Sequence, residues 1–279
     1  MTSETETDPI NEPGPDETDG DHKRMSIIDH LTELRRRLMY AAIAFVVVFL
    51  ICFYFSNIFF NFLVAPLADV WQGDENRRLI FTAMHEKFFT NIKVAFFAAA
   101  FLAFPIFAIQ IWMFVAPGLY KNEKGAFLPF LIATPFLFFA GGAFVYYFVM
   151  PVAWEFFTGF EQLAAGPGEL SIELEPKVNE YLSLVMRLIF AFGLSFELPV
   201  VISLLARVGM VTPTGLRKKR RYAIVSAFIA AAILTPPDPL SQLALAIPII
   251  LLYELSIYCT VLIWRSKDRA AAEAAGEDG

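Results

Sequence analysis

Charged residues are missing from long stretches of this sequence. Between Met39 and Leu67 the chain carries none, and between Arg187 and Arg207 it carries one, Glu197. Hydrophobic residues make up 57% of the 279 residues, 30 residues are phenylalanine, and the mean hydropathy is +0.56. This composition excludes an ordinary soluble domain and indicates a protein that crosses a membrane several times.

Residues that catalysis commonly uses are also scarce. The two cysteines, Cys52 and Cys259, lie in apolar runs outside any Cys-x-x-Cys or metal-ligand spacing, which is typical of inert buried thiols. The three histidines all lie outside the apolar runs, so Ser195 has no histidine base for nucleophilic catalysis. The chain also lacks a glycine-rich phosphate-binding loop ending in lysine. We therefore expect no enzymatic activity, no cofactor, no metal and no nucleic-acid partner.

The N-terminal region has two parts. Residues 1–24 are acidic and nearly free of large apolar side chains, which predicts a disordered tail rather than a signal peptide. In residues 26–38 apolar side chains recur at helical spacing, which predicts an amphipathic helix on the membrane surface before the chain turns into the bilayer. Glu33 and Arg37 are four residues apart in this segment, where a helix allows an ion pair.

The apolar runs predict an all-α integral membrane protein with six transmembrane helices, within a membrane domain at 25–265 and before a short tail at 266–279. The run after residue 38 is longer than a bilayer needs, so its end at about 57–66 should emerge at the interface. Residues 222–235 supply only about 21 Å of helix, which predicts that the last two helices are short and that the bilayer thins there. The predicted spans are 39–56, 94–115, 126–149, 179–206, 222–235 and 242–254, with 150–178 as a structured loop.

Basic residues indicate the orientation of these spans. With the N-terminus in the cytoplasm, the inner segments hold sixteen lysines and arginines and the outer segments hold six. Because basic residues favour the cytoplasmic side, both termini should be cytoplasmic. In the third span, Gly141 and Gly142 would allow close helix contact.

Glu197 is the least expected residue of the apolar runs. About 15 Å of helix separates it from Arg187 on one side and from Arg207 on the other, which places it near the middle of the bilayer. An ionisable group at that depth costs about 3 kcal/mol on insertion scales, so it should face a protein interior or a wet concave surface. A proton- or ion-coupled small-molecule transporter would also explain such a group.

Several separate motifs, in order, resemble the TatC family, the core receptor subunits of the twin-arginine protein translocase. The resemblance covers about residues 25–265 and departs from the family in the acidic N-terminal tail and the short C-terminal tail. The matching segments are 30–38 (HLTELRRRL), 65–67 (APL), 119–123 (LYKNE), 192–199 (FGLSFELP), 216–220 (LRKKR) and 234–238 (LTPPD).

The resemblance implies a function and partners. Members of the family bind signal peptides that carry two consecutive arginines, and they act with the single-span subunits TatA and TatB in a multimeric complex. Folded proteins are then exported with the energy of the proton gradient. The absence of a transit-peptide composition in 1–24 favours a multi-pass protein of a bacterial inner membrane.

The resemblance also implies site residues. Glu33 and Glu123 would receive the arginine pair at the cytoplasmic face, with Arg35, Leu119 and Tyr120 beside them. A carboxylate binds a guanidinium through two parallel hydrogen bonds that an ammonium cannot reproduce, which explains a preference for arginine over lysine. The alternatives are an ion pair of Glu33 with Arg37 and a solvated loop charge at Glu123.

Other matches carry more open alternatives. Glu197 would be the polar wall of a concave face that meets the signal peptide or a partner helix, or else would make a structural hydrogen bond between helices. Thr235 and Gln242 match a polar site where partner spans dock, and Asp238 could belong to it or cap the sixth helix. The remaining matches, which could equally be helix kinks or packing residues, are Pro66, Phe88, Phe89, Pro105, Gln110 and Phe114.

Overall fold

The protein is a bundle of long helices. The computed structural model describes residues 27–71, 77–119, 124–162, 170–235 and 239–277. A helical fold follows from the apolar runs, because a helix satisfies its own backbone hydrogen bonds within a bilayer. The helices are α1 (Ile27–Tyr54), α2 (Ser56–Val70), α3 (Glu86–Leu119), α4 (Lys124–Phe144), the π-helix η1 (Val145–Val149), α5 (Met150–Thr158), α6 (Val178–Phe196), α7 (Leu198–Arg207), α8 (Pro213–Leu234) and α9 (Pro239–Glu277).

Five helical stretches among the described residues are long and apolar enough to cross a membrane. The third joins α4, η1 and α5, and the fourth joins α6 and α7. The sixth predicted span corresponds to α9, whereas the fifth corresponds to α8, whose first part carries a basic cluster. The five stretches are Leu31–Tyr54, Glu86–Phe114, Leu128–Thr158, Val178–Arg207 and Ser241–Arg269.

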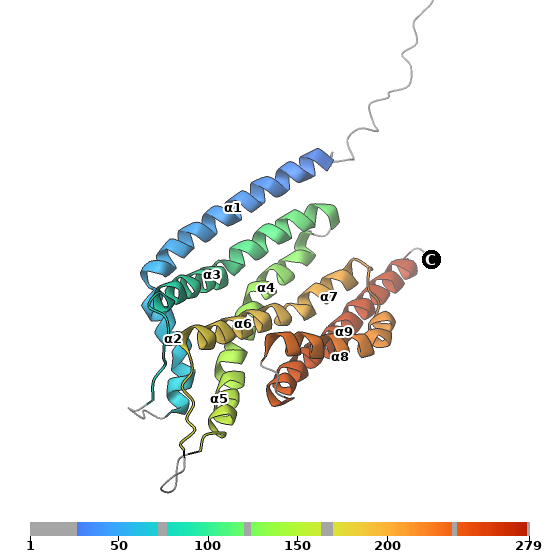
Figure 1. Cartoon of the computed structure of the whole chain (residues 1–279). Coiled ribbons are helices and arrows are strands. Elements are labelled where there is room, and N and C mark those ends of the chain that lie inside the picture. Colours follow the sequence, from blue (N-terminus) through green and yellow to red (C-terminus); the bar gives the residue numbers. More distant parts are fainter. Residues whose placement is uncertain (1–26, 72–76, 120–123, 163–169, 236–238, 278–279) are drawn as a thin grey trace, which may run out of the picture.

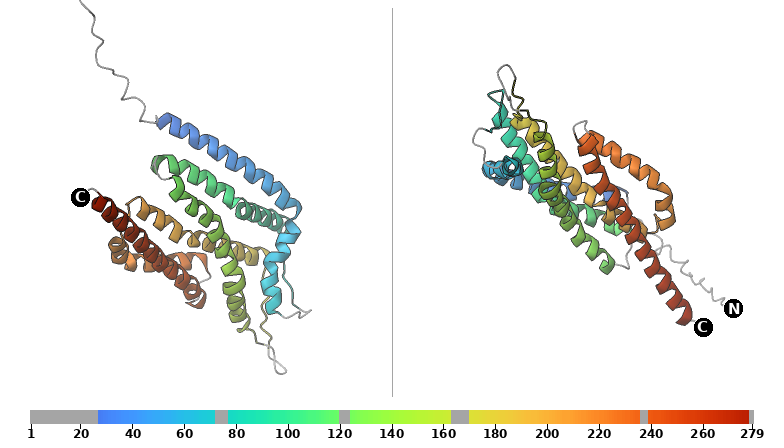
Figure 2. Two further views of the ribbon diagram at one scale, coloured as in Figure 1. Left: turned by 180° about the vertical axis from the view of Figure 1, so that it is seen from behind. Right: turned by 90° about the horizontal axis from the view of Figure 1, so that it is seen from below.

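Successive long helices run in opposite directions (Figures 1 and 2). The helix α1 runs to the turn before α2, α3 returns alongside it, and the alternation continues through α9. The start of α1, the end of α3, the start of α4 and the end of α9 therefore lie at one end of the molecule, which we call the inner end. The helices α2 and α5 lie at the opposite, outer end.

The first helix differs from its prediction. Residues 26–38 do not form a separate surface helix, because α1 runs without a break from Ile27 to Tyr54. The glutamate, arginine and leucine residues of this segment are good helix formers, and no glycine or proline interrupts them. The break that the length of the apolar run predicts falls at Phe55, after which α2 begins.

Two glycines bring α4 into close contact with its neighbours. A Cβ atom on Gly141 would lie 2.6 Å from the backbone oxygen of Phe192 in α6, and one on Gly142 would meet an aromatic ring of α3. From the α6 side, a Cβ atom on Gly193 would lie 2.7 Å from the ring of Phe138. Both phenylalanines are fully buried. The predicted close contact at the glycine pair is confirmed, and it fixes the separation of α4 and α6.

The predicted fourth span is interrupted at its glutamate. Glu197 ends α6 and precedes α7, and Pro199 occupies the first turn of α7. Proline lacks a backbone N–H and so cannot continue the hydrogen-bond ladder of α6. The Val201 backbone N–H donates to the Glu197 carbonyl oxygen over 2.9 Å, so α7 starts immediately after the break. In contrast, α3 continues through Pro105.

The outer end contains more helix than the sequence predicts. Residues 150–178 begin with α5, and η1 connects α5 to α4. Beyond α5, an antiparallel bridge joins Gln162 to Ile172, and a parallel bridge joins Ile80 to Lys177. The predicted structured loop is therefore confined to the residues after Thr158.

The last helix also differs from its prediction. With 39 residues, α9 is the longest described helix, so the expectation of two short final helices is wrong for the second of them. Glu254 does not end the apolar segment. Its Oε2 atom accepts a hydrogen bond of 2.6 Å from Nη2 of Arg220 in α8, and α9 continues with apolar residues and then through residues 266–277.

Candidate functional site

The carboxylate of Glu33 already binds a guanidinium. Glu33 lies near the start of α1, at the inner end. Its Oε1 atom accepts a hydrogen bond of 2.9 Å from Nε of Arg37 and a second one from Nη2 of the same residue. The Glu33 side chain is 15% exposed and that of Arg37 is 14% exposed. The predicted i,i+4 pair is confirmed, and one guanidinium supplies both of these donors.

The other residues predicted for signal binding belong to the same end of the molecule or fall outside the described ranges. Arg35 is exposed on α1. Leu119 ends α3 and Lys124 begins α4, and α3 packs along α1, so both helix ends lie at the inner end with Glu33. Tyr120 and Glu123 lie outside the described residues.

A polar cluster of Glu197, Thr134 and Trp112 joins three helical stretches inside the apolar region. Glu197 is 8% exposed and lies beside the hydroxyl group of Thr134 in α4. That hydroxyl donates to the Phe130 carbonyl oxygen over 3.0 Å and accepts a hydrogen bond of 3.1 Å from the indole Nε1 of Trp112 in α3. Oε1 of Glu197 is buried and has no hydrogen-bond partner among the described residues.

The Oε1 atom of Glu197 is an unsatisfied acceptor in an apolar environment, although the carboxylate lies beside the Thr134 hydroxyl. An unsatisfied buried oxygen costs about 1–3 kcal/mol, and a donor from a bound peptide or helix would recover that cost. Sequence reasoning found Glu197 but missed Thr134 and Trp112. Thr134 could have been found as a hydroxyl within an apolar run, whereas the role of Trp112 depends on the packing of α3 against α4.

Thr235 and Gln242 both bind the backbone of α8. The Thr235 hydroxyl donates to the Ala231 carbonyl oxygen over 2.8 Å, and Nε2 of Gln242 in α9 donates to the Phe228 carbonyl oxygen over 3.3 Å. The Gln242 bond ties the start of α9 to α8 at the outer end, whereas the Thr235 bond is local to the end of α8. Asp238, between the two helices, lies outside the described residues.

The remaining predicted residues are spread along the bundle. Pro66 is buried in α2, where it lines a cavity at the outer end. Phe88 and Phe89, in the first turn of α3, are more than half exposed. Pro105, Gln110 and Phe114 are half-buried in α3. The structure therefore does not bring these residues to the same place as Glu33.

Comparisons with known proteins show which family the chain resembles. A profile of the family "Sec-independent protein translocase protein (TatC)" matches residues 29–248. The chain is 51% identical over 255 residues to the Sec-independent protein translocase protein TatC of Magnetococcus marinus, covering 91% of this chain and 90% of that protein. It is 41% identical over 232 residues to the protein of the same name from Escherichia coli (strain K12), covering 83% of this chain and 86% of that one.

A solved structure supports the same relationship. The crystal structure of a twin-arginine translocase receptor, TatC, superposes with a TM-score of 0.72 at 37% identity, covering 84% of this chain and 99% of that one. The comparisons therefore favour a protein translocase component over the small-molecule transporter that the buried glutamate also suggested.

Proposed function

The chain belongs to the TatC family of Sec-independent protein translocase proteins, and on this premise we propose that it binds twin-arginine signal peptides at the cytoplasmic face of the inner membrane. As a member of this family it is a multi-pass membrane subunit of the translocase rather than an enzyme. The proposal concerns what it recognises and where.

The position of Glu33 at the inner end and its ability to accept a guanidinium carry the proposal. Oε1 of this half-buried carboxylate accepts hydrogen bonds from both Nε and Nη2 of Arg37, the helical ion pair that is the alternative to signal binding. A signal arginine that displaced Arg37 could bind the carboxylate through both of its oxygens. A lysine ammonium is a point charge and cannot reproduce this paired donation. The signal arginine would exchange with Arg37 at Glu33, and the second arginine would bind Glu123 in the connection between α3 and α4.

The orientation of the chain follows from the same proposal. The inner end and both termini face the cytoplasm. In this orientation α8 is a further, short span between the fourth and fifth of the longer stretches. The basic cluster 217–221 at the start of α8 supports this orientation, because basic residues favour the cytoplasmic side. The bilayer would thin around α8.

The polar cluster would act after recognition. The apolar part of the signal peptide would enter between the spans, where Oε1 of Glu197 offers a buried acceptor. Single-span subunits of the TatA and TatB type would dock near Thr235 and Gln242 at the outer ends of α8 and α9. The proton gradient would drive export of the folded protein.

Site-specific photocrosslinking of a signal peptide tests recognition at Glu33. The probe is a signal peptide with a photoreactive group beside its Arg-Arg pair. The control peptide is identical except that Lys-Lys replaces Arg-Arg. Membranes that contain the complete translocase should give adducts at the start of α1 and in the α3–α4 connection with the Arg-Arg peptide only. Glu33→Gln should reduce these adducts.

The matched control is Glu254→Gln. Glu254 is also paired with an arginine, but on α9 rather than α1, so its substitution should leave the adducts unchanged. Equal labelling by the Arg-Arg and Lys-Lys peptides would count against the receptor function. Normal labelling of Glu33→Gln would instead reject this residue as the binding site.

A further inference from the structure

A polar cavity of about 610 Å³ opens at the outer end of the molecule. It lies between the end of α2 and the η1–α5 segment, where the third membrane-crossing stretch ends at Thr158. Its lining includes the carboxylates of Asp69, Glu155 and Glu161 and one cation, Arg77. The cavity is within the size range of small-molecule and headgroup sites.

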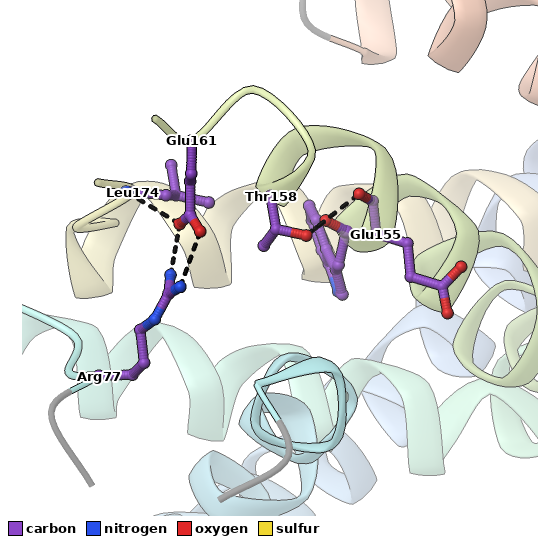
Figure 3. A network of polar contacts seen from close by, with 6 residues as sticks. Arg77, Glu155, Thr158, Glu161 and Leu174 are labelled. Atoms are coloured by element: carbon purple, nitrogen blue, oxygen red, sulfur yellow. Dashed lines mark hydrogen bonds and ion pairs between the residues drawn. The ribbon is translucent and has the colours of Figure 1, made fainter. Parts of the chain in front are cut away.

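Among the described residues that line the polar cavity, carboxylates outnumber cations. Nη1 and Nη2 of Arg77 bind the two carboxylate oxygens of Glu161, with 2.7 Å between Nη2 and Oε2, and the Leu174 backbone N–H donates to the same carboxylate (Figure 3). The Glu155 carboxylate points away from this pair. Asp69 and Glu155 are exposed and make no ion pair with another described residue. Two carboxylates at this cavity therefore have no paired cation among the described residues.

A second cavity, of about 470 Å³, adjoins the first and is almost entirely apolar. It lies among α2, α3, α4 and α6, of which α3, α4 and α6 belong to membrane-crossing stretches, and phenylalanine and aliphatic side chains form most of its wall. Ala143 lines it and is exposed. An apolar space beside lipid has the chemistry of a site for a hydrocarbon chain.

Tyr146 and Tyr147 line both cavities. They lie in η1, and π-helices occur frequently at functional sites. The Tyr146 ring stacks on Phe62 with 4.4 Å between centroids, and its hydroxyl donates to the Phe62 carbonyl oxygen over 2.8 Å. Tyrosine is typical of the boundary between lipid tails and headgroups. The polar and apolar cavities therefore meet at the depth where a lipid changes from chain to headgroup.

We propose that the two cavities together bind one phospholipid whose headgroup ends in a primary ammonium. The ammonium binds Asp69 and Glu155, and one acyl chain occupies the apolar cavity below Tyr146 and Tyr147. The two unbalanced carboxylates attract an ammonium and repel a headgroup with net negative charge. In the orientation proposed above, this lipid belongs to the outer leaflet.

Native mass spectrometry of the full-length protein tests the proposal. The protein is exchanged into detergent with an equimolar mixture of phosphatidylethanolamine and phosphatidylglycerol of identical chains. The wild type should retain the ethanolamine lipid in preference. Asp69→Asn combined with Glu155→Gln should lower this retention about fivefold to tenfold, because each exposed ion pair contributes only modestly. The control Glu173→Gln, an exposed carboxylate outside the cavity, should retain it fully.

A second pair of variants tests the apolar cavity as the binding site of the acyl chain. Ala143→Phe fills the apolar cavity without disturbing a buried contact and should reduce retention of both lipids, whereas Ala42→Phe, at an exposed position of α1, should not. Equal retention of both lipids by the wild type would overturn the proposal. So would unchanged retention in the double carboxylate variant or in Ala143→Phe. Loss of signal-peptide binding by Glu33→Gln is independent of all these results.

Discussion

Replacing Glu33 by glutamine should weaken the binding of an Arg-Arg signal peptide by a calculable amount. A charge-assisted hydrogen bond to a half-buried carboxylate contributes about 1.5–3 kcal/mol, and Glu33→Gln removes the charge from that bond. The arriving arginine must first displace Arg37, and an i,i+4 pair of this kind is worth about 0.3–0.5 kcal/mol. The net loss in Glu33→Gln is about 1–2.5 kcal/mol, a rise in Kd of about 5- to 70-fold.

Fluorescence anisotropy measures this change directly. A labelled Arg-Arg peptide is titrated with the complete receptor complex in nanodiscs, using wild type, Glu33→Gln and the control Glu254→Gln. Glu254 has an arginine partner 2.6 Å away, so the control removes a similar ion pair elsewhere. A Kd for Glu33→Gln within twofold of the wild-type value would refute the assignment.

Removing the competing arginine should act in the opposite direction. Arg37→Gln frees the Glu33 carboxylate, and the energy of the pair corresponds to about twofold tighter peptide binding. Weaker binding by this variant would show instead that Arg37 holds the carboxylate in its binding position. The same titration distinguishes the two results.

Three further substitutions test the interior of the bundle. Glu197→Leu should raise the Tm of the purified protein, because an unsatisfied buried oxygen costs about 1–3 kcal/mol, and should lower transport in membrane vesicles; unchanged transport would make the residue dispensable. Gly141→Ala should destabilise by about 1–3 kcal/mol through overpacking against α6, which a thermal melt would detect, whereas Ile132→Val on the exposed side of α4 should be neutral. Gln242→Leu should reduce crosslinking to single-span subunits without changing peptide affinity, and equal reduction of both would indicate a general loss of structure.

The fold was largely predictable because membrane helices leave a strong signal in sequence. Long uncharged runs identify the helices, and the glycine pair at Gly141 and Gly142 identifies a close contact that the structure confirms. The errors arose where one charged residue was given too much weight. Glu254 seemed to end the last apolar segment, but a partner on α8 balances its charge and α9 continues. In the same way, the charges at 33–37 do not end α1.

The candidate site was predictable only in part, since contacts between helices have no local sequence pattern. The Glu33–Arg37 pair follows from a spacing of four residues. The polar cluster around Glu197 does not, because Thr134 and Trp112 come from two other helices. The two cavities meet at Tyr146 and Tyr147, which lie in η1. This meeting point could not be predicted, because the sequence 145–149 gives no sign of a π-helix.

The α3–α4 pair connects the three polar sites of the molecule. Its inner ends flank the connection that contains Glu123, its middle supplies Trp112 and Thr134 to the polar cluster, and α4 continues into η1 beside the outer cavity. The contact of Gly141 with the α6 backbone fixes how closely α4 approaches Glu197. Because tightly packed helices move as rigid units, a shift of the inner end of α4 would carry the adjoining part of α6 with it and keep Thr134 beside Glu197.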